Sequence, residues 1–315
     1  MSLLNGVSRE VYPNGDTYEG DFRRGARHGR GTYYSSDGSR FEGEFVEGKM
    51  EGKGSYFYPK DEMYEGEWLD SMRHGYGTFS YQDGSKYEGR WQCDLRHGQG
   101  LMKYKDGSMY SGQWDGDHRH GQGQMSFADG GHYSGAWASN SRHGRGVMKL
   151  PNGSTYEGEF FEDIPSGEGR QQDAEEHSIY QGQFAEGLRH GEGGCEYTEK
   201  KEKFVGEWTK GCRLSGVMFC SNGEVCRVGY LNDKLVRHEK LSAREQRRLI
   251  AESNGETFEE EEEEHEKGEG GREDDHESPS DSPSPPAPQE EEGAKEAQKQ
   301  PATGTEAGPP EAVAA

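Results

Sequence analysis

A row of histidines is the first feature of the sequence that could support chemistry. The histidines stand in a repeated His-Gly-x-Gly motif, at His28, His74, His97, His120, His143 and His190. Imidazole nitrogen binds zinc at about 2.0 to 2.1 Å. If the copies lie on adjacent hairpins of one sheet, equivalent histidines stand roughly 9.5 Å apart. One zinc ion cannot join ligands at that spacing, so we expect structural histidines that pack or hydrogen-bond near turns, and no metal site.

An arginine precedes each of these histidines and offers a second kind of chemistry, the binding of anions. The row is Arg27, Arg73, Arg96, Arg119, Arg142 and Arg189. Guanidinium groups in a row suit anionic lipid head groups or the carboxylates of a partner, which makes Arg73, Arg96, Arg119 and Arg142 the candidate anion-binding residues. The alternative is cross-strand ion pairing on a solvated face, with Glu19, Glu42, Glu65, Glu88 and Glu157 as the acidic partners. We favour pairing, and both interpretations stay open here.

The motifs of common enzyme classes are missing from the sequence. It contains no Gly-x-Ser-x-Gly elbow, no phosphate loop ending in Gly-Lys-Ser/Thr, no His-Glu-x-x-His and no kinase signature. The many carboxylates recur with the repeat and do not form one distinguished pair. We therefore expect a protein that is not an enzyme, with no catalytic residues, no metal and no cofactor.

A repeat must position all of these side chains. An aromatic-x-Gly-x-aromatic unit begins at Tyr18, Phe41, Tyr64, Tyr87, Tyr110, Tyr133 and Tyr156, always 23 residues apart, and again at Tyr180 and Phe204 after steps of 24. The closing aromatic residues are Phe22, Phe45, Trp68, Trp91, Trp114, Trp137, Phe160, Phe184 and Trp208. All five tryptophans of the chain occupy this one position, which indicates a structural role by default.

Each repeat has the pattern of one antiparallel hairpin. Between Tyr64 and Trp68, aromatic residues and Gly66 alternate with carboxylates, which is the period of two that places one set on each face of a strand. Asn-Gly and Asp-Gly pairs, such as Asp83-Gly84, suit a type I′ hairpin turn. The fold class we predict is all-β, an elongated single-layer antiparallel meander. Gly66 then gives the two rings beside it the space to pack.

The aromatic side chains are candidates for partner binding, because a single-layer sheet has no second layer to bury them. The candidate partner-binding residues are Trp68, Trp91, Trp114, Trp137, Tyr81 and Tyr104. The alternative is that the aromatic residues only pack on one another along the face that they share.

Four regions follow from the repeat and its ends. Residues 1–17 form an N-terminal half-repeat, and 18–230 hold nine repeats and a degenerate tenth. Residues 231–255 form a capping region, in which the capping box Ser242-x-x-Glu245 begins a short helix that ends near Asn254-Gly255. We expect Leu241, Leu249 and Ile250 to cover the open sheet edge. Residues 256–315 form an acidic, Pro-rich and Ser-rich tail that we expect to be disordered.

Composition restricts the other function classes. Of the 315 residues, 28% are apolar and 49 are glycine, which is too little apolar surface for a thick sandwich core. The net charge is -23; residues 256–315 hold 20 acidic and 4 basic residues, or -16, which leaves -7 for the rest. A mildly acidic array offers no broad surface for nucleic acid. Residues 1–12 lack the apolar run of a secretory signal, and no stretch approaches the roughly 18 apolar residues of a spanning helix. The five cysteines form no CxxC pair, so we expect a cytoplasmic protein with reduced thiols.

The run Tyr-Glu-Gly-Glu-Trp, then Arg-His-Gly-x-Gly, then Asp-Gly resembles the membrane occupation and recognition nexus (MORN) repeat, over roughly residues 6–230. The resemblance implies an elongated, twisted antiparallel sheet with a scaffolding role. Nine repeats followed by a Glu-rich tail are also similar to the layout of the MORN-repeat radial spoke head proteins of cilia and flagella.

Three functions follow as expectations. The first is a scaffold or adaptor for other proteins in the cytoskeleton, in particular the axoneme of cilia or flagella. The alternative is a peripheral membrane adaptor that binds anionic phospholipids through the arginine row. Self-association into a homo-oligomer, through an exposed face or the degenerate end, is the third.

Overall fold

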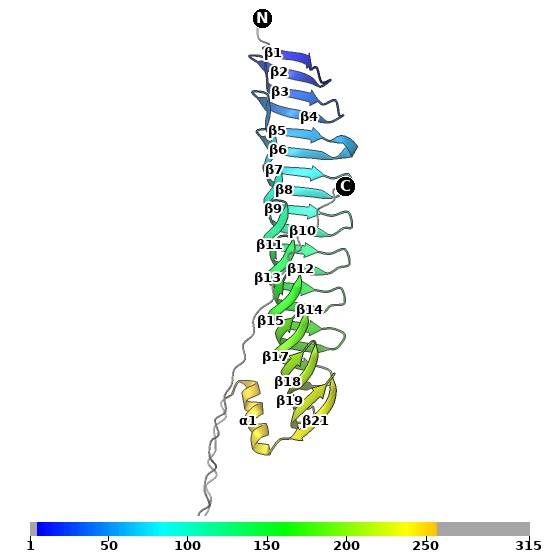
Figure 1. Ribbon diagram of the computed structural model, residues 1–315, viewed down its shortest axis with the longest axis vertical. Coiled ribbons are helices and arrows are strands. Elements are labelled where there is room, and N and C mark those ends of the chain that lie inside the picture. The colour runs from blue at the N-terminus through cyan, green and yellow to red at the C-terminus, as the bar shows by residue number, and fades with distance from the viewer. Residues whose placement is uncertain (1–4, 257–315) are drawn as a thin grey trace, which may run out of the picture. The chain divides into compact units, whose positions relative to one another are not determined.

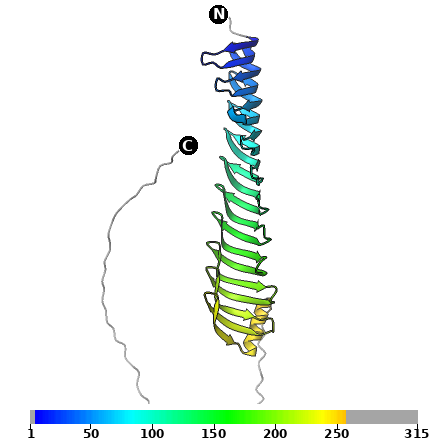
Figure 2. The same cartoon turned by 90° about the vertical axis from the view of Figure 1, so that its right-hand side faces the viewer.

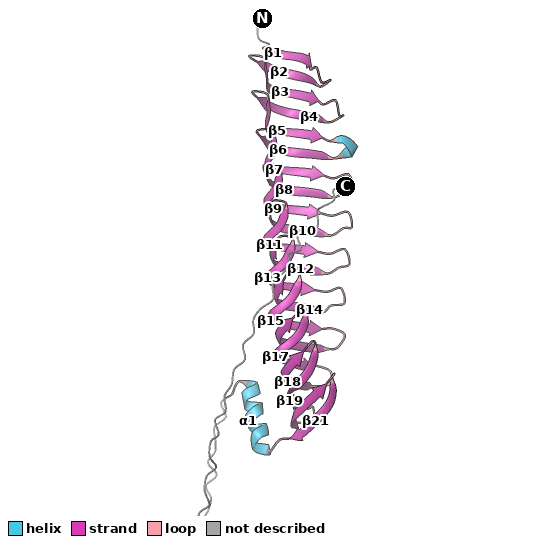
Figure 3. Ribbon diagram, viewed as in Figure 1, coloured by secondary structure: helices cyan, strands magenta, loops and turns pink. Residues whose placement is uncertain are grey.

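The structure is a computed structural model that describes residues 5–256. These residues form one sheet in which every strand pairs antiparallel with the next along the chain, from β1 (Gly6–Val11) to β21 (Lys234–Lys240). Figure 1 shows the strands stacked in chain order along a ribbon, and Figure 3 shows how few of the described residues are helical. The predicted fold, an open single-layer meander with a short C-terminal helix, is confirmed.

The two strands of a hairpin differ in length. β4 and β8 each hold 7 residues, whereas β5 and β9 each hold 9. The strands between the two ends are β2 (Thr17–Arg23), β3 (Ala26–Tyr34), β4 (Arg40–Val46), β5 (Lys49–Phe57), β6 (Met63–Leu69), β7 (Met72–Ser80), β8 (Lys86–Gln92), β9 (Leu95–Lys103), β10 (Met109–Asp115), β11 (His118–Ser126), β12 (His132–Ala138), β13 (Ser141–Lys149), β14 (Thr155–Phe161), β15 (Ile164–Asp173), β16 (Ser178–Ala185), β17 (Leu188–Tyr197), β18 (Glu202–Thr209), β19 (Cys212–Phe219) and β20 (Val225–Leu231).

The two long edges of the ribbon carry different turns. Within a repeat, a two-residue turn such as Asp70-Ser71 joins the strands, and both residues have positive φ (52° and 68°), as a type I′ turn requires. Between repeats the connection is longer, and only the glycine of the Asp-Gly pair, such as Gly84 (φ 90°), has positive φ. The predicted type I′ turn at the Asp-Gly pairs is therefore wrong. There, Gly84 N–H donates to Tyr81 O at 3.0 Å, which closes a turn whose central residues have negative φ.

The core is a double row of aromatic rings on one face of the sheet, which we call the aromatic face. Tyr64 is 0% exposed and Trp68 is 5% exposed. The Tyr64 ring meets Trp68 edge to face at 5.1 Å and meets Trp91 of the next repeat at 5.4 Å. Tyr87 makes the same two contacts with Trp91 and Trp114. Each tyrosine thus joins its own repeat to the next, in the edge-to-face geometry that aromatic pairs prefer.

A row of glycines lies under these rings and explains much of the glycine content. Gly66 and Gly77 are directly opposite each other in β6 and β7, and the Tyr64 ring covers both. A Cβ added at Gly66 would lie 2.5 Å from the Gly77 Cα and from the Tyr64 hydroxyl. That hydroxyl donates to Glu67 O at 3.0 Å, beside the shift of register that follows Gly66. No larger residue fits under the ring without displacing it, as the sequence predicted for Gly66.

Three connections between repeats lack the Asn-Gly or Asp-Gly pair; in those after β15 and β17, His177 (φ 50°) and Lys201 (φ 53°) have positive φ. Between β5 and β6 the chain forms a short 3-10 turn, η1 (Pro59–Asp61), in which Lys60 has φ 69° and Asp61 has φ 64°. The aromatic rows continue past it, because Phe41 contacts Trp68 at 5.2 Å. The irregularity is therefore confined to the edge of the ribbon.

The C-terminal helix α1 (Ala243–Asn254) begins and ends as predicted. Ser242 and Glu245 form a reciprocal capping box, and Gly255 ends the helix in the left-handed conformation (φ 75°). Figures 1 and 2 place α1 beside the last strands, and Lys203 Nζ of β18 donates to Ser253 Oγ at 3.0 Å. Within residues 5–256, no helix has the length and apolar character needed to cross a bilayer.

The helix does not cover the sheet edge as expected. Every residue of β21 is exposed, and so is Ile250, whereas Leu241 is buried and Leu249 is half-buried. The expectation was wrong because α1 turns back toward β18 and leaves the outer side of β21 open. The tail from Thr257 onward, predicted to be disordered, lies outside the described residues.

The glycine row predicts a sharp difference between two neighbouring glycines of β17. A Cβ at Gly193 would overlap the hydroxyl and ring carbons of Tyr180, whereas a Cβ at Gly194 would find its nearest neighbour at 3.8 Å. We expect Gly193→Ala to lower the free energy of unfolding by about 1 to 3 kcal/mol through overpacking. Gly194→Ala should be neutral or stabilise by up to about 1 kcal/mol. Urea unfolding followed by circular dichroism measures both, and equal effects of the two variants would contradict the packing argument.

The buried tyrosines predict alkaline unfolding. Burial raises the pKa of Tyr110, Tyr133 and Tyr180 from 10.0 to about 12. Because the unfolded chain loses these protons first, stability is fully present below pH 10 and falls as the pH rises toward 12. Tyrosinate absorbance and circular dichroism should change together in that window. The variant Tyr110→Phe should lose less stability over this pH range, since Phe41 and Phe204 already fill equivalent buried positions. Ionisation of the buried tyrosines near pH 10 with an unchanged sheet would contradict the prediction.

Candidate functional site

The histidine row lies on the face opposite the aromatic rings, which we call the polar face. His74 is directly opposite Glu67, and His120 is directly opposite Gln113. His97 Nδ1 lies 3.3 Å from Asp115 Oδ1 in the neighbouring strand. Across residues 5–256, no three His, Cys, Asp or Glu side chains gather closely enough to hold a metal ion. His74, His97 and His120 thus face polar neighbours, whereas the His143 ring lies 5.3 Å from the ring of Phe161.

The predicted partner-binding tryptophans are part of the core. Trp68, Trp91, Trp114 and Trp137 are 3 to 5% exposed. Each indole N–H also donates to a glycine carbonyl of the glycine row, as Trp68 Nε1 does to Gly54 O at 3.0 Å and Trp91 Nε1 to Gly77 O at 3.2 Å. The rings and their one polar atom are therefore used within the sheet. A partner-binding role for these four residues stays a prediction.

Tyr81 and Tyr104 differ from the tryptophans because they remain partly accessible. Both lie at the end of the aromatic face next to the longer connections and pack against the core. The Tyr81 ring is 4.5 Å from the Phe79 ring, and burial raises the pKa of its hydroxyl. Of the six predicted partner-binding residues, these two are partly buried, whereas the four tryptophans are buried.

The predicted anion-binding arginines tie each hairpin to the next. Arg96 Nε contacts Asp117 Oδ1 at 2.8 Å, and its Nη2 donates to Asp117 O at 3.1 Å. The backbone repeats the link in both directions, since Arg96 N–H donates to Asp117 Oδ1 and Asp117 N–H donates to Arg96 O. The guanidinium also lies 4.4 Å from the Trp114 ring centroid, a favourable cation–π distance. The donors of Arg96 are thus engaged inside the array.

The same link recurs along the row. Arg73 and Arg142 pair with Asp94 and Asp163, and Arg119 donates to the Asn140 carbonyl. The cross-strand partners that we predicted for the arginines, Glu19, Glu42, Glu65, Glu88 and Glu157, were wrong. These glutamates alternate with the core tyrosines and so lie on the polar face, whereas the arginines lie over the aromatic rings. The acidic partners of Arg73, Arg96 and Arg142 come from the two-residue turns instead, 21 residues further along the chain. Arg189 pairs with Glu176, which stands 13 residues earlier.

A second set of links joins the longer connections on the opposite edge of the ribbon. Ser85 Oγ accepts from Lys105 N–H at 3.0 Å, and Ser108 Oγ accepts from Ala128 N–H at 3.1 Å. Sequence reasoning missed these links. The sequence nevertheless holds a signal for them, because each acceptor serine stands 20 residues before its donor N–H. Where that serine is replaced by Gly131, which has no side-chain acceptor, the residue 20 positions later is Pro151, which has no N–H.

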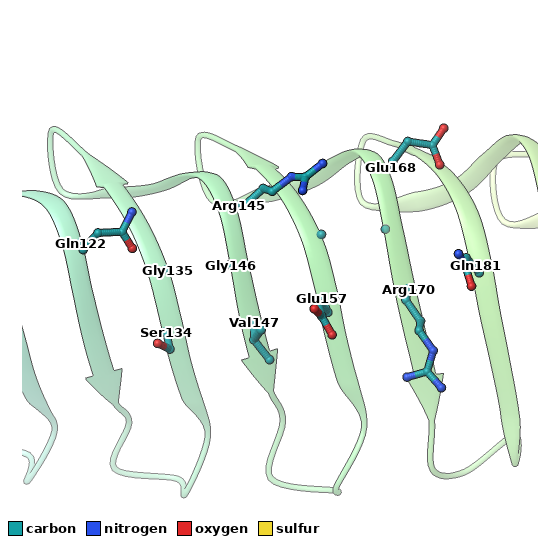
Figure 4. A pocket seen from close by; sticks show the side chains of 12 residues that line it. Gln122, Ser134, Gly135, Arg145, Gly146, Val147, Glu157, Glu168, Arg170 and Gln181 are labelled. Atoms are coloured by element: carbon teal, nitrogen blue, oxygen red, sulfur yellow. The ribbon is translucent and has the colours of Figure 1, made fainter.

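The polar face has shallow hollows along the glycine row. The hollow in Figure 4, about 560 Å³ in volume, is lined by alternating charges that include Arg145, Glu157, Glu168 and Arg170. Glu157 and Arg170 stand directly opposite each other on β14 and β15. The hollow is open to solvent and lined by charges of both signs, so it does not enclose a substrate or select an anion.

Exposed apolar side chains form a row on the polar face beside the two-residue turns, and we call it the turn row. It has two stretches, one of Val46, Leu69 and Leu95 and one of Phe161, Ile164 and Leu188, all 44 to 57% exposed. Asp115, His118 and Ser141 occupy equivalent positions between the stretches. The turns stack on one another, as Ser71 N–H donates to Met50 O at 3.0 Å. Sequence reasoning missed this row, in which Val46, Leu69 and Phe161 directly follow a closing aromatic residue and the other three stand four residues after one.

Structural comparison finds distant likenesses. The TCP10 domain of Danio rerio CPAP is 10% identical, with 74% of this chain and 100% of that chain covered and a TM-score of 0.34. The Drosophila melanogaster SAS-4 TCP domain, solved with a proline-rich motif of Ana2, is 15% identical, with 49% and 84% covered and a TM-score of 0.30. Such scores carry no argument about this chain. No curated protein sequence matches it.

A family model for the MORN repeat matches the chain over most of the array. The matched segments are residues 18–40, 41–63, 64–86, 87–109, 110–132, 133–155, 156–175 and 180–199. They follow one another with a single short gap and cover more than half of the sequence. Each full match begins at the core aromatic residue of a first strand and ends at the start of the next. The chain therefore belongs to the MORN repeat family.

Proposed function

We propose that the chain is a non-enzymatic scaffold that binds partner proteins along its ribbon, in the cytoskeleton of cilia or flagella. The observation that carries the binding role is the turn row. Its apolar side chains are 44 to 57% exposed, and they lie on the two sides of the two-residue turns, at the last residue of a first strand or the first residue of a second strand. Apolar residues that stand in a line on an otherwise polar face are typical of a protein-binding surface.

The spacing of the turn row suits one kind of partner. Equivalent positions in successive hairpins are two strands apart, or roughly 9.5 Å. An α-helix laid along the ribbon presents residues i and i+7 about 10.5 Å apart. A helix with one apolar residue every two turns can therefore contact Val46 on β4 and Leu69 on β6 with a small mismatch. Leu95 begins β9, three strands or roughly 14 Å beyond Leu69, so the same helix reaches it about three turns further on. We propose an amphipathic helix of another protein as the partner.

The proposed ciliary location rests on the order of regions along the sequence. The similarity to radial spoke head proteins lies in an array of about nine MORN repeats followed by a Glu-rich segment. In support of a scaffold, the described residues form open hollows with charges of both signs, and the arginines are engaged in links between repeats. For that reason we propose protein binding and not lipid binding.

The turn row is tested by placing charge in its first stretch. The double variant Leu69→Asp, Leu95→Asp should lose axonemal partners in co-purification from ciliated cells. Burial of a leucine side chain is worth about 1.5 to 3 kcal/mol when complete, so two half-exposed leucines should weaken binding by at least about tenfold. Both side chains point away from the core, so the thermal midpoint should not change.

The matched control is Leu150→Asp, a leucine of similar exposure (42%) on the longer connections. It should retain the same partners. Recovery of axonemal proteins by both variants would contradict the turn row as the binding surface. If neither the wild-type chain nor the control recovers an axonemal protein from ciliated cells, the ciliary scaffold itself is contradicted.

A further inference from the structure

The two outermost strands of the described sheet each have one free side. β1 pairs only with β2, and β21 pairs only with β20. The outer N–H and C=O groups of such strands are a template for another strand. Both strands also carry exposed valines: Val7 is 83% exposed and Val11 is 65% exposed in β1, and Val236 is 65% exposed in β21. The question is which strand could complete either edge.

Strand direction decides how a second copy of the chain can join. The sheet has 21 antiparallel strands within residues 5–256. Because this number is odd, β1 and β21 run in the same direction. Copies added head to tail would then place β1 beside β21 in parallel, against the pattern of the whole sheet. Two copies related by a twofold axis perpendicular to the sheet instead place a strand antiparallel to its own copy, and the ladder continues unbroken.

The charges distinguish the two edges. β21 carries Lys234, Arg237 and Lys240. A twofold centred on Arg237 would set Lys234 against Lys240 of the other copy and Arg237 against itself. Lysine and arginine on an edge strand are a common barrier to such pairing. Arg237 and Lys240 have acidic partners in their own copy, Glu239 at 2.8 Å and Glu224 at 3.0 Å, so the edges differ in the number of charges: β21 holds three Lys or Arg residues and one carboxylate, whereas β1 holds Arg9 and Glu10. A twofold centred on Arg9 also sets Arg9 against itself, and each Arg9 is paired with Glu19 of its own β2 at 3.1 Å.

We propose that two copies of the chain associate through β1 in a twofold antiparallel pair centred on Arg9, which extends the sheet across the dimer. The pairing continues an interface that the molecule already uses between all its neighbouring strands. It goes beyond the scaffold function, because it concerns the end of the ribbon and not the turn row.

The residues of β1 fit this register on both faces. On the polar face, where Arg9 stands opposite Glu19, Val7 would meet Val11 of the second copy and Val11 would meet its Val7. On the aromatic face, where Glu10 stands opposite Tyr18, each Glu10 would meet Ser8 of the second copy. The hydroxyl can donate to the carboxylate there. A shift by one residue in each copy would instead set Glu10 against Glu10, so the like charges would repel.

The contact between the two β1 strands, which we call the seam, would differ from the contact between neighbouring repeats of one chain. The position of Glu10 is filled by Tyr33, Tyr56 and Phe79 in the next three hairpins, where each packs beside the core rings. A carboxylate at this position suits a polar seam and not a continued aromatic row. The valine contacts on the polar face are the apolar part of the proposed interface.

Light scattering on the full chain tests the proposal. The wild-type chain should have twice the mass of one chain, and Val7→Lys, Val11→Lys should halve it. The matched control Leu235→Lys, Val236→Lys makes the same change on β21 and should stay dimeric. Circular dichroism should show equal strand content in all three. A single-chain mass for the wild type, or a loss of the dimer in the β21 variant alone, would overturn the proposal.

A cross-link tests the register. In a Cys93→Ser background, which removes an exposed thiol, Arg9→Cys should form a disulfide between copies under mild oxidation, because directly opposite residues place their Cβ atoms about 4.5 to 5.5 Å apart. Arg237→Cys in the same background should remain a single chain on a non-reducing gel. If Arg237→Cys cross-links and Arg9→Cys does not, the copies meet at β21 and the proposal is wrong.

Discussion

The packing of a tyrosine or phenylalanine ring over a pair of glycines is the contact on which the rest of the array depends. In the third hairpin, the Tyr64 ring covers Gly66 and Gly77 and reaches the indoles of Trp68 and Trp91. The backbone of two strands thus serves as the surface against which the ring is buried, and no second layer is needed. This is how a chain with 28% apolar residues buries its largest side chains completely.

The two edges of the ribbon hold consecutive hairpins in register by different means. On one edge, a charged and reciprocal link such as Arg96 with Asp117 joins turns 21 residues apart. On the other, a buried serine such as Ser85 accepts one backbone N–H from the next connection. Both links act only between neighbouring repeats. Stability is therefore expected to be local, as in other repeat arrays, where each unit depends on its two neighbours.

The sequence was sufficient for the strands, the hairpins and the aromatic core, because strict periods of two and of 23 show them directly. It did not single out the type I′ turns, because their first position varies freely, as in Asp70, Cys93 and Ser139, and their second is a Gly, Asp, Asn or Ser of the kind found in any loop, as in Ser71, Asp94 and Asn140. The Asp-Gly pairs gave the stronger local signal and misplaced the turn. The partners of the arginines were missed for a related reason. The glutamates belong to the same repeat motif as the arginines, but the alternation of the strand places the glutamates on the polar face and the arginines on the aromatic face.

The arrangement separates the residues that define the repeat from those that the fold leaves free to vary. The aromatic rings, the glycines and the arginines are engaged in contacts within and between hairpins, so a change at any of them costs stability before it changes binding. The turn row is free of this constraint, since its side chains contribute little to the core. Its apolar character ends at Asp115, His118 and Ser141 and returns at Phe161. Partner choice can therefore be encoded at these positions while the period and the fold stay the same.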